Sequence, residues 1–427
     1  MAITARVGVL AVIGAVVVGL GAPSWGGVAA VAGVLLLLVL LDLALAGAVR
    51  GLRFTRSGAT STRLGEAADV HLTIANPGNR PVRGLVRDAW PPSAGAERDR
   101  HPATIPPGER RTITVTLRPT RRGERPAARV TVRSTGPLGL AARQGSHRVP
   151  WAVRVLPPFH SRRHLPSRLA RLQQLDGRQA ALVRGAGTEF DSLREYVIGD
   201  DVRSIDWRAT ARAADVMVRT WRPERDRHVL LVLDTGRTSA GRVGDEPRLD
   251  AMMEAALLLA TLATRAGDRV DLLAYDRQLR AKVSGRDVAT LVNAMAPLEP
   301  SLLETDARGL VGEVLRRARH RSLVVLLTGL DAAPLEEGLL PVLPSLTSRH
   351  RLLVASVADP RIAEMARGRG TAEAVYDAAA AERTLADRRH VTALLGRHGV
   401  EVVDAVPDEL PPALADRYLA MKAAATP

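Results

Sequence analysis

Residues 199–212, GDDVRSIDWRATAR, hold three aspartates, three arginines and a tryptophan within fourteen positions. Carboxylates at this density could act as acids or bases, ligate an ion, or pair with the arginines. The segment has no histidine and no base beside a hydroxyl nucleophile, so we expect no active site there. It predicts an ion-pair network, because arginine makes bidentate contacts with carboxylates. The predicted pairs are Asp200 and Asp201 with Arg203, and Asp206 with Arg208 and Arg212.

The network is interpreted as a brace between the preceding linker and the domain that follows. Trp207, flanked by Ile205 and Ala209, is predicted to be a core residue rather than a ligand platform. The stretch 214–224, ADVMVRTWRPE, alternates as a strand. The alternative is a direct partner-binding surface, and the two interpretations are compatible.

Beyond residue 228 the chain predicts an α/β domain with a doubly wound sheet. Continuous apolar runs typical of buried parallel strands alternate with helical segments. The predicted strands are HVLLVLD (228–234), RVDLLAYD (269–276), SLVVLLTG (322–329), RLLVASVAD (351–359) and VEVVDAV (400–406), and the main helices lie within 246–267, 306–320 and 381–399. Ligands in such sheets bind outside the carboxyl ends of the strands, so Asp234, Asp276 and residues 328–331 are the positions to examine. The domain has no glycine-rich nucleotide loop.

Residues 51–157 predict an antiparallel β-sandwich of immunoglobulin type. Short alternating runs are separated by turns such as NPGN and PPGE. In TITVTL, Ile113, Val115 and Leu117 share one face while the threonines share the other. No polar cluster here suggests chemistry, so a binding or spacing module is expected.

Residues 1–50 predict two transmembrane helices. Residues 7–22 and 26–41 are free of charge and are joined by the turn PSWGG, and flanking apolar residues bring each close to the roughly 20 residues that a bilayer requires. Arginines flank the pair but are absent from the turn, so both ends and the soluble domains are expected on the cytoplasmic side of the cell membrane. Asp42 is interpreted as a snorkelling residue near that face, with a functional intramembrane acid as the alternative.

Residues 158–186 are interpreted as a basic linker with one helix. Its basic run comprises His160, Arg162, Arg163, His164, Arg168 and Arg171. The run could contact anionic lipid, or it could be a solvated helix face.

Composition limits the function classes. The chain has no cysteine, which excludes a disulfide framework, thiol catalysis and cysteine-ligated zinc. Its net charge is +15, and Lys282 and Lys422 are the only lysines among 60 basic residues. An arginine excess fits GC-rich coding as well as an anionic ligand, and an aromatic content of 3% is too sparse for a nucleic-acid stacking platform.

Residues 187–236, GTEFDSLREYVIGDDVRSIDWRATARAADVMVRTWRPERDRHVLLVLDTG, resemble the bacterial family called domain of unknown function 58, or DUF58. The resemblance extends to the order of membrane hairpin, β-rich middle and α/β domain. Residues 187–427 comprise the family signature segment and the α/β domain. It implies that the C-terminal domain is similar to von Willebrand factor type A domains. The family-motif positions, which form the brace or an interaction surface, are Arg194, Tyr196, Gly199, Asp200, Asp201, Arg203, Asp206, Trp207 and Arg212.

The type A resemblance also implies a divalent-ion site at the end of the first strand. Mg²⁺ needs near-octahedral oxygen ligation. The loop DTGRT offers Asp234 and Thr238, and a second loop offers Thr305, but Gly236 and Gly329 stand where two further ligands would be. The resemblance thus implies a degenerate metal site, and a vestigial loop without metal is the stronger expectation.

Members of the family are commonly encoded beside MoxR-type AAA+ ATPases, and the pair is thought to assemble or activate other proteins. The expected function is therefore a membrane-anchored, non-enzymatic adaptor or chaperone-like protein with no small-molecule substrate. One alternative is an arginine-rich protein that binds nucleic acid or anionic lipid. A second is a metal-dependent hydrolase, for which the sequence lacks a convincing ligand set.

Overall fold

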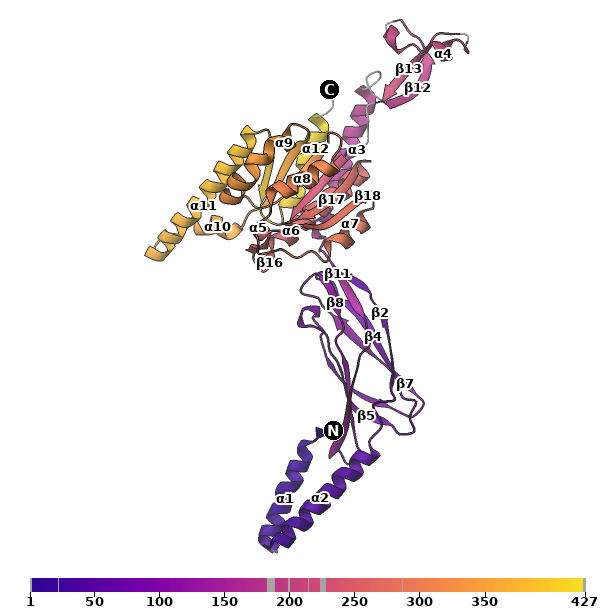
Figure 1. Ribbon diagram of the computed structural model, residues 1–427, viewed down its shortest axis with the longest axis vertical. Helices are drawn as coiled ribbons and strands as arrows, with labels where there is room; N and C mark the ends of the chain where they lie inside the picture. The colour runs from indigo at the N-terminus through magenta and orange to yellow at the C-terminus, as the bar shows by residue number, and fades with distance from the viewer. Residues whose placement is uncertain are drawn as a thin grey trace. The chain divides into compact units, whose positions relative to one another are not determined.

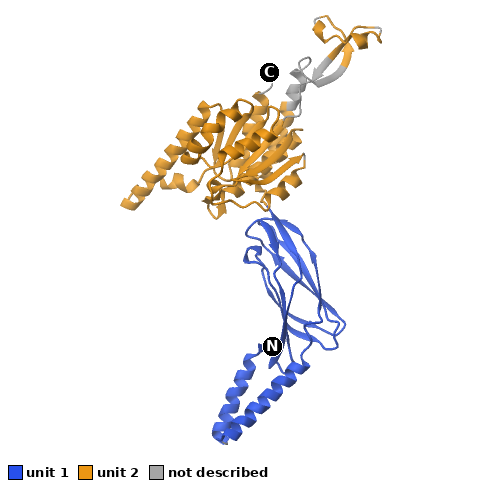
Figure 2. Ribbon diagram, in the orientation of Figure 1, with its two compact units in different colours: residues 1–156 blue, residues 157–427 orange. Residues whose placement is uncertain are grey.

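The computed structural model describes residues 2–21, 23–182, 189–198, 200–213, 215–222, 228–285 and 287–424. Gly199, one of the predicted motif positions, lies outside the described residues. The chain divides into two compact units, Met1–Leu156 and Pro157–Pro427 (Figure 2).

The first unit opens with two apolar helices, α1 (Ala5–Gly21) and α2 (Trp25–Leu45), which pack together (Figure 1). Gly14 permits the close approach, because a β-carbon there would lie 2.4 Å from Cγ1 of Val31. Among the helices that the structure describes, only α2 is long and apolar enough to cross a membrane by length and composition, and α1 is a shorter apolar helix. One of the two predicted membrane spans is therefore long and apolar enough to cross a bilayer.

The β module of this unit packs its sheets around one apolar core. The first sheet has the order β1 (Ala2–Ile3), β10 (Ala141–His147), β9 (Val130–Thr135), β5 (Val82–Asp88) and β6 (Arg100–Ile105). The second is β2 (Arg53–Gly58), β4 (Ala68–Ala75) and β7 (Arg110–Leu117), and the third is β3 (Ser61–Arg63), β11 (Ala152–Leu156) and β8 (Gly123–Pro126). Ile113, Val115 and Leu117 of β7 are buried, as the alternation predicted. Most pairings are antiparallel, but β3 and β11 run parallel.

Asp42 anchors α2 to this β module, so its interpretation as a snorkelling residue was wrong. The side chain is fully buried, and its carboxylate accepts backbone N–H bonds from Leu138, Leu140 and Ala141, each at 2.7 Å. Gly136 leaves the carboxylate room, because a β-carbon there would lie 2.2 Å from its Oδ1. The N-terminus is held as well, since β1 pairs with β10. Both ends of the helix pair are thus fixed to one sheet.

The second unit contains the predicted α/β domain (Figure 1). Its sheet has the order β18 (Leu279–Gly285), β17 (Arg269–Tyr275), β14 (His228–Asp234), β19 (Leu323–Leu327), β20 (Arg351–Val357) and β21 (Glu401–Ala405). The five predicted strands are present and parallel. The antiparallel edge strand β18 was not predicted, because its polar and apolar residues alternate without a continuous apolar run.

Helices cover both faces of the sheet. On one face α6 (Arg248–Arg265) packs with α12 (Leu410–Ala424), while the other face buries α8 (Ala307–Arg317), α9 (Leu343–Thr347) and α11 (Ala372–Arg397). The shorter elements are α5 (Arg237–Ala240), β15 (Arg242–Val243), β16 (Glu246–Pro247), α7 (Val288–Met295), η4 (Pro334–Leu339), η5 (Leu340–Val342) and α10 (Pro360–Met365). This arrangement places the carboxyl ends of β14, β17 and β19 side by side.

The predicted linker is part of this unit. It forms η2 (His160–His164) and α3 (Leu165–Leu182), which pack against α6 and α12. Arg168 and Arg171 reach Asp416 of α12, with Arg168 Nη2 at 2.8 Å from Oδ2. Two members of the basic run are therefore engaged by protein, which leaves fewer of them for lipid.

Candidate functional sites

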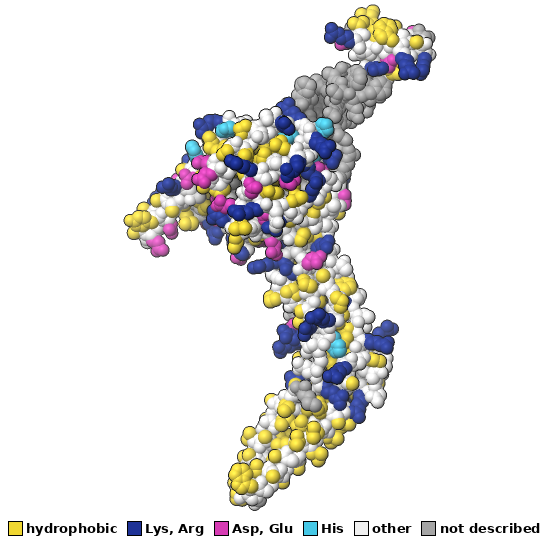
Figure 3. Space-filling model, viewed as in Figure 1, with side chains coloured by type: hydrophobic (Ala, Val, Ile, Leu, Met, Phe, Trp, Pro, Cys, Tyr) yellow, Lys and Arg dark blue, Asp and Glu magenta, His cyan; other side chains and the backbone are white. Residues whose placement is uncertain are grey.

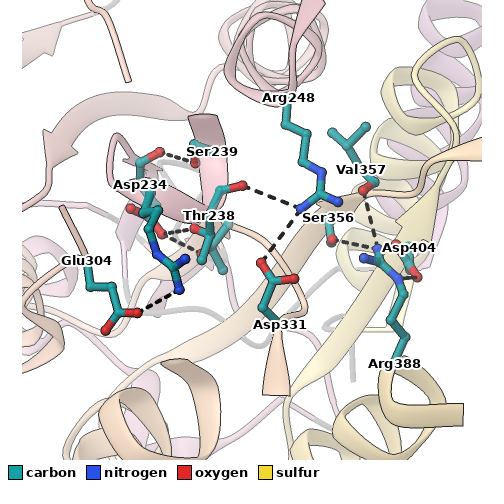
Figure 4. A network of polar contacts seen from close by, with 12 residues as sticks. Asp234, Thr238, Ser239, Arg248, Glu304, Asp331, Ser356, Val357, Arg388 and Asp404 are labelled. Atoms are coloured by element: carbon teal, nitrogen blue, oxygen red, sulfur yellow. Dashed lines mark hydrogen bonds and ion pairs between the residues drawn. The ribbon is translucent and has the colours of Figure 1, made fainter. Parts of the chain in front are cut away.

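Asp234 lies at the carboxyl end of the central strand β14 and collects four hydrogen-bond donors. Its Oδ1 accepts the N–H of Gly236 at 2.8 Å and the Thr305 hydroxyl, while Oδ2 accepts the hydroxyls of Thr238 at 3.0 Å and Thr328 at 2.6 Å. The three residues predicted as metal ligands, Asp234, Thr238 and Thr305, thus meet in space. Figure 4 shows Asp234 and Thr238 facing one another at this end of the sheet.

The position of Thr305 on the neighbouring loop explains why residue 236 is glycine. A β-carbon at Gly236 would lie 2.0 Å from Oγ1 of Thr305, so any side chain would displace that hydroxyl. The Ser239 hydroxyl does not approach the carboxylate and instead donates to the backbone oxygen of Asp234 at 2.6 Å. The Thr305 hydroxyl therefore occupies the space of a side chain at position 236, and Asp331 Oδ2 and Thr238 Cβ lie 2.8 Å and 3.0 Å from where a β-carbon at Gly329 would stand.

The donor set does not fit a tight Mg²⁺ site. Asp234 is buried, and all of its roughly four acceptor positions are used by protein donors. Glu304 also lines the pocket beside it but pairs with Arg237 at 2.8 Å. Asp331 does not contribute, because it pairs with Arg248 at 3.6 Å (Figure 4). The described residues contain no group of three or more His, Cys, Asp or Glu side chains that could hold a metal ion. The small pocket beside Asp234, about 40 Å³, has room for an ion or a water but not for a metabolite.

We expect Mg²⁺ to leave the stability of this domain unchanged. If Mg²⁺ bound only the folded state and its concentration were 100 times its Kd, the free energy of unfolding would rise by about 2.7 kcal/mol. Such a rise would increase Tm by several degrees. Thermal unfolding of the full chain in EDTA and in about 5 mM Mg²⁺, which is about 100 times the Kd of a roughly 50 µM site, should give the same Tm. A rise that is abolished in Asp234→Asn would contradict this assessment.

Asp276, the second strand-end carboxylate, is used structurally. It accepts the N–H groups of Arg277 and Gln278 and the guanidinium of Arg280, the last at 2.7 Å. Burial raises its pKa, but these hydrogen bonds outweigh burial and leave the pKa below its ordinary value. The carboxylate holds the β17–β18 turn and is not available for ligand.

A larger pocket, about 370 Å³, lies at the opposite, amino-terminal edge of the sheet. Within it the buried Asp268 accepts Lys422 Nζ at 2.7 Å and Tyr418 Oη at 2.5 Å. Lys422 also donates to the backbone oxygen of Ala266 at the end of α6. These contacts fasten α12 to α6, so we assign the group a structural role.

The aspartates of residues 199–212 form hydrogen bonds and ion pairs within one β-hairpin. The hairpin consists of β12 (Glu189–Glu195) and β13 (Met217–Arg222), with η3 (Val202–Ser204) and α4 (Trp207–Thr210) between them. Asp201 accepts the Arg203 N–H and caps η3, while Asp206 accepts the N–H groups of Arg208 and Ala209 and caps α4. These carboxylates thus stabilise the two short helices between the strands of the hairpin.

The predicted ion pairs have different partners in the structure. Asp200 pairs with Arg194 at 2.5 Å, and Asp206 with Arg219 at 2.7 Å. Arg194 lowers the pKa of Asp200, and the Ala209 N–H followed by Arg219 lowers that of Asp206. Arg203 and Arg212 are exposed and form no ion pair with a described carboxylate. The brace therefore stabilises the hairpin itself.

The hairpin also presents an exposed apolar surface, which we call the hairpin patch: Val197, Ile198, Val202 and Trp207. Ile198 is 96% exposed and Trp207 is 70% exposed, so the prediction that Trp207 is a core residue was wrong. Tyr196 lies nearby and its N–H donates to Val216 O at 2.7 Å. Figure 3 shows hydrophobic side chains gathered on the segment that carries α4.

Comparison with known families points to the same part of the chain. The model of the family described as "Protein of unknown function DUF58" matches residues 192–395. This match contains the hairpin patch, Asp234, Thr305 and Thr328. The predicted resemblance is therefore supported over that range.

Related proteins are found in mycobacteria. Uncharacterized proteins of Mycobacterium tuberculosis and Mycobacterium bovis are 26% identical over 197 residues, which cover 45% of this chain and 61% of each relative. The match thus spans about three fifths of the length of these curated relatives.

Two solved structures are each similar to about a quarter of the chain. The von Willebrand factor domain of the type V pili tip protein Mfa5 from Porphyromonas gingivalis is 16% identical, with a TM-score of 0.20 over 25% of this chain and 38% of that chain. Native α2-macroglobulin from Escherichia coli is 18% identical, with a TM-score of 0.21 over 25% and 17%. Similarity at this level does not define a shared fold.

Sequence reasoning missed two features of these sites. Thr328 was noted only as part of a strand-end turn, although its position after a buried parallel strand next to Asp234 could have identified it. No sequence pattern indicated the exposure of Ile198 and Trp207, because Ile198 lies outside regular structure and Trp207 begins the four-residue helix α4, which is too short to show a period.

Proposed function

We propose that the chain is a membrane-anchored, non-enzymatic adaptor that binds a MoxR-type AAA+ ATPase through the hairpin patch. The observation that carries the proposal is the exposure of Ile198, Val202 and Trp207 within the family-matched range. Clustered apolar side chains on a protein surface mark sites of protein association, and tryptophan is enriched among residues that dominate binding energy.

The remaining parts have supporting roles in this proposal. Helices α1 and α2 form two membrane spans with both ends in the cytoplasm, since arginines flank the pair and none lies in the turn. The immunoglobulin-like β module is a spacer, and the type A-like α/β domain with its metal-free Asp234 cluster carries the hairpin and engages client proteins. The non-enzymatic role is supported by the protein donors that saturate Asp234 and Asp276.

Capture of the ATPase tests this proposal. Full-length chain is solubilised from its native membranes in mild detergent with ATP, and bound proteins are identified by mass spectrometry. Ile198→Ser/Trp207→Ser should recover at least about tenfold less AAA+ ATPase than the unchanged chain, because losing one hot spot costs about 2 kcal/mol or more. The matched control is Val375→Ser/Tyr376→Ser on α11, where Tyr376 is 77% exposed outside the patch.

The outcomes separate the alternatives. Equal recovery with both double variants would contradict a role for the hairpin patch. Failure to recover an AAA+ ATPase under any condition would contradict the adaptor proposal, and retained nucleic acid with steep salt dependence would favour the nucleic-acid alternative.

A further inference from the structure

Six exposed arginines gather at the end of the β module from which the apolar helices extend. We call this group the arginine collar: Arg50, Arg53, Arg80, Arg83, Arg110 and Arg111. Arg50 lies five residues after the end of α2, and Arg80 donates to the backbone oxygen of Ala44 in that helix. Figure 3 shows basic side chains over the β module next to the hydrophobic helices.

Strand register places the rest of the collar at the same end. Arg53 of β2 and Arg110 of β7 both lie opposite Ala75 of β4, so they form a row across that sheet. Asn76 then joins the two sheets, because its side-chain amide donates to Arg80 O at 2.8 Å and to Ile105 O at 3.0 Å. Ile105 is paired with Val82, the neighbour of Arg83.

The positive charge of the collar is not balanced by the protein. Glu109 is the only carboxylate in segments 46–53, 76–83 and 105–111, which supply the six arginines. None of the six forms an ion pair with a carboxylate in the described part of the chain. Elsewhere in the β module some exposed arginines are paired, as Arg87 is with Asp99 and Arg118 is with Glu97. Asp42 adds no compensation at the surface, since it is buried against backbone amides.

We propose that the arginine collar binds the phosphate groups of anionic phospholipids around the helix pair. The inference rests on the membrane anchoring of the proposed function. With α1 and α2 in the bilayer, the collar would lie at headgroup level, where each basic residue strengthens attraction to an anionic surface roughly fivefold. Arginine suits this role because its guanidinium binds phosphate in a bidentate manner. Contact around the base of the helices would hold the β module at a fixed height above the membrane.

Native mass spectrometry of the full chain in neutral detergent tests the collar directly. The chain is titrated with phosphatidylglycerol and separately with phosphatidylcholine, and bound lipids are counted. We expect phosphatidylglycerol to bind at least about tenfold more tightly, and Arg83→Gln/Arg110→Gln/Arg111→Gln to lose that preference. Arg98→Gln/Arg121→Gln/Arg129→Gln removes the same charge from exposed positions outside the collar and should retain it.

Three results would overturn the proposal. One is equal binding of the two lipids, and another is an unchanged preference in the collar variant at a Tm equal to that of the control. The third is tight binding of a single-stranded oligonucleotide at the collar without lipid preference. Alkaline carbonate extraction of membranes tests anchoring separately, because release of the chain would refute the membrane spans whatever the lipid preference.

Discussion

Replacing Asp268 with asparagine should lower the free energy of unfolding of the α/β unit by about 3–5 kcal/mol, because it leaves the buried ammonium of Lys422 without its compensating charge. Lys422 and Asp268 are both buried, and their contact fixes α12 on α6. Urea unfolding of the full chain, followed by hydrogen exchange in α12, measures the loss.

A surface pair on the same helix provides the control. Arg417 of α12 pairs with Glu401, and both side chains are partly exposed. Glu401→Gln should cost no more than about 1 kcal/mol, as is usual for exposed ion pairs. Equal effects of the two substitutions would refute the structural role assigned to Asp268. Asp268→Leu/Lys422→Met should recover most of the loss, because removing both charges leaves no unpaired ion.

Asp42→Ala should loosen the joint between α2 and the β module. The buried N–H groups of Leu140 and Ala141 and the partly buried N–H of Leu138 would lose a charged acceptor, at about 1–3 kcal/mol for each buried group. We expect hydrogen exchange in residues 136–142 to accelerate at least about a hundredfold, since each 1.4 kcal/mol corresponds to a factor of ten.

Asp69→Ala is the matched control for this joint. Asp69 is exposed and accepts one hydroxyl hydrogen bond, from Thr116 at 2.7 Å. Its loss should change exchange in residues 136–142 less than about threefold, because surface substitutions usually cost under about 0.5 kcal/mol. Unchanged protection in Asp42→Ala would show that the carboxylate does not hold the joint.

The regular elements were predictable from sequence because burial imposes a period on them. Four of the five parallel strands are predominantly apolar, and β7 alternates residue by residue. Trp207 was misplaced because it begins a four-residue helix between two capped turns, where neighbouring residues say little about which side is buried. Alternation without a continuous apolar run likewise concealed β18.

The hydrogen-bond and ion-pair partners of the aspartates could not be predicted from the sequence. Asp42 binds amides almost a hundred residues away, so its local apolar surroundings suggested a lipid-facing role. Asp200 and Asp206 pair with arginines on the flanking strands, rather than with the nearer Arg203 and Arg208. Asp234, Thr238 and Thr305 were grouped in advance through the resemblance to von Willebrand factor type A domains, and the parallel strands bring their loops together at one edge of the sheet.

Site-specific photocrosslinking at position 207 tests the central claim most directly. A photoreactive amino acid replaces Trp207 in the full chain in living cells, and the matched control carries it at Tyr376, which is equally exposed on α11. The adaptor proposal predicts a light-dependent adduct between position 207 and an AAA+ ATPase, identified by mass spectrometry, and none at position 376. Absence of an ATPase adduct at position 207, or an equal yield at both positions, would contradict it.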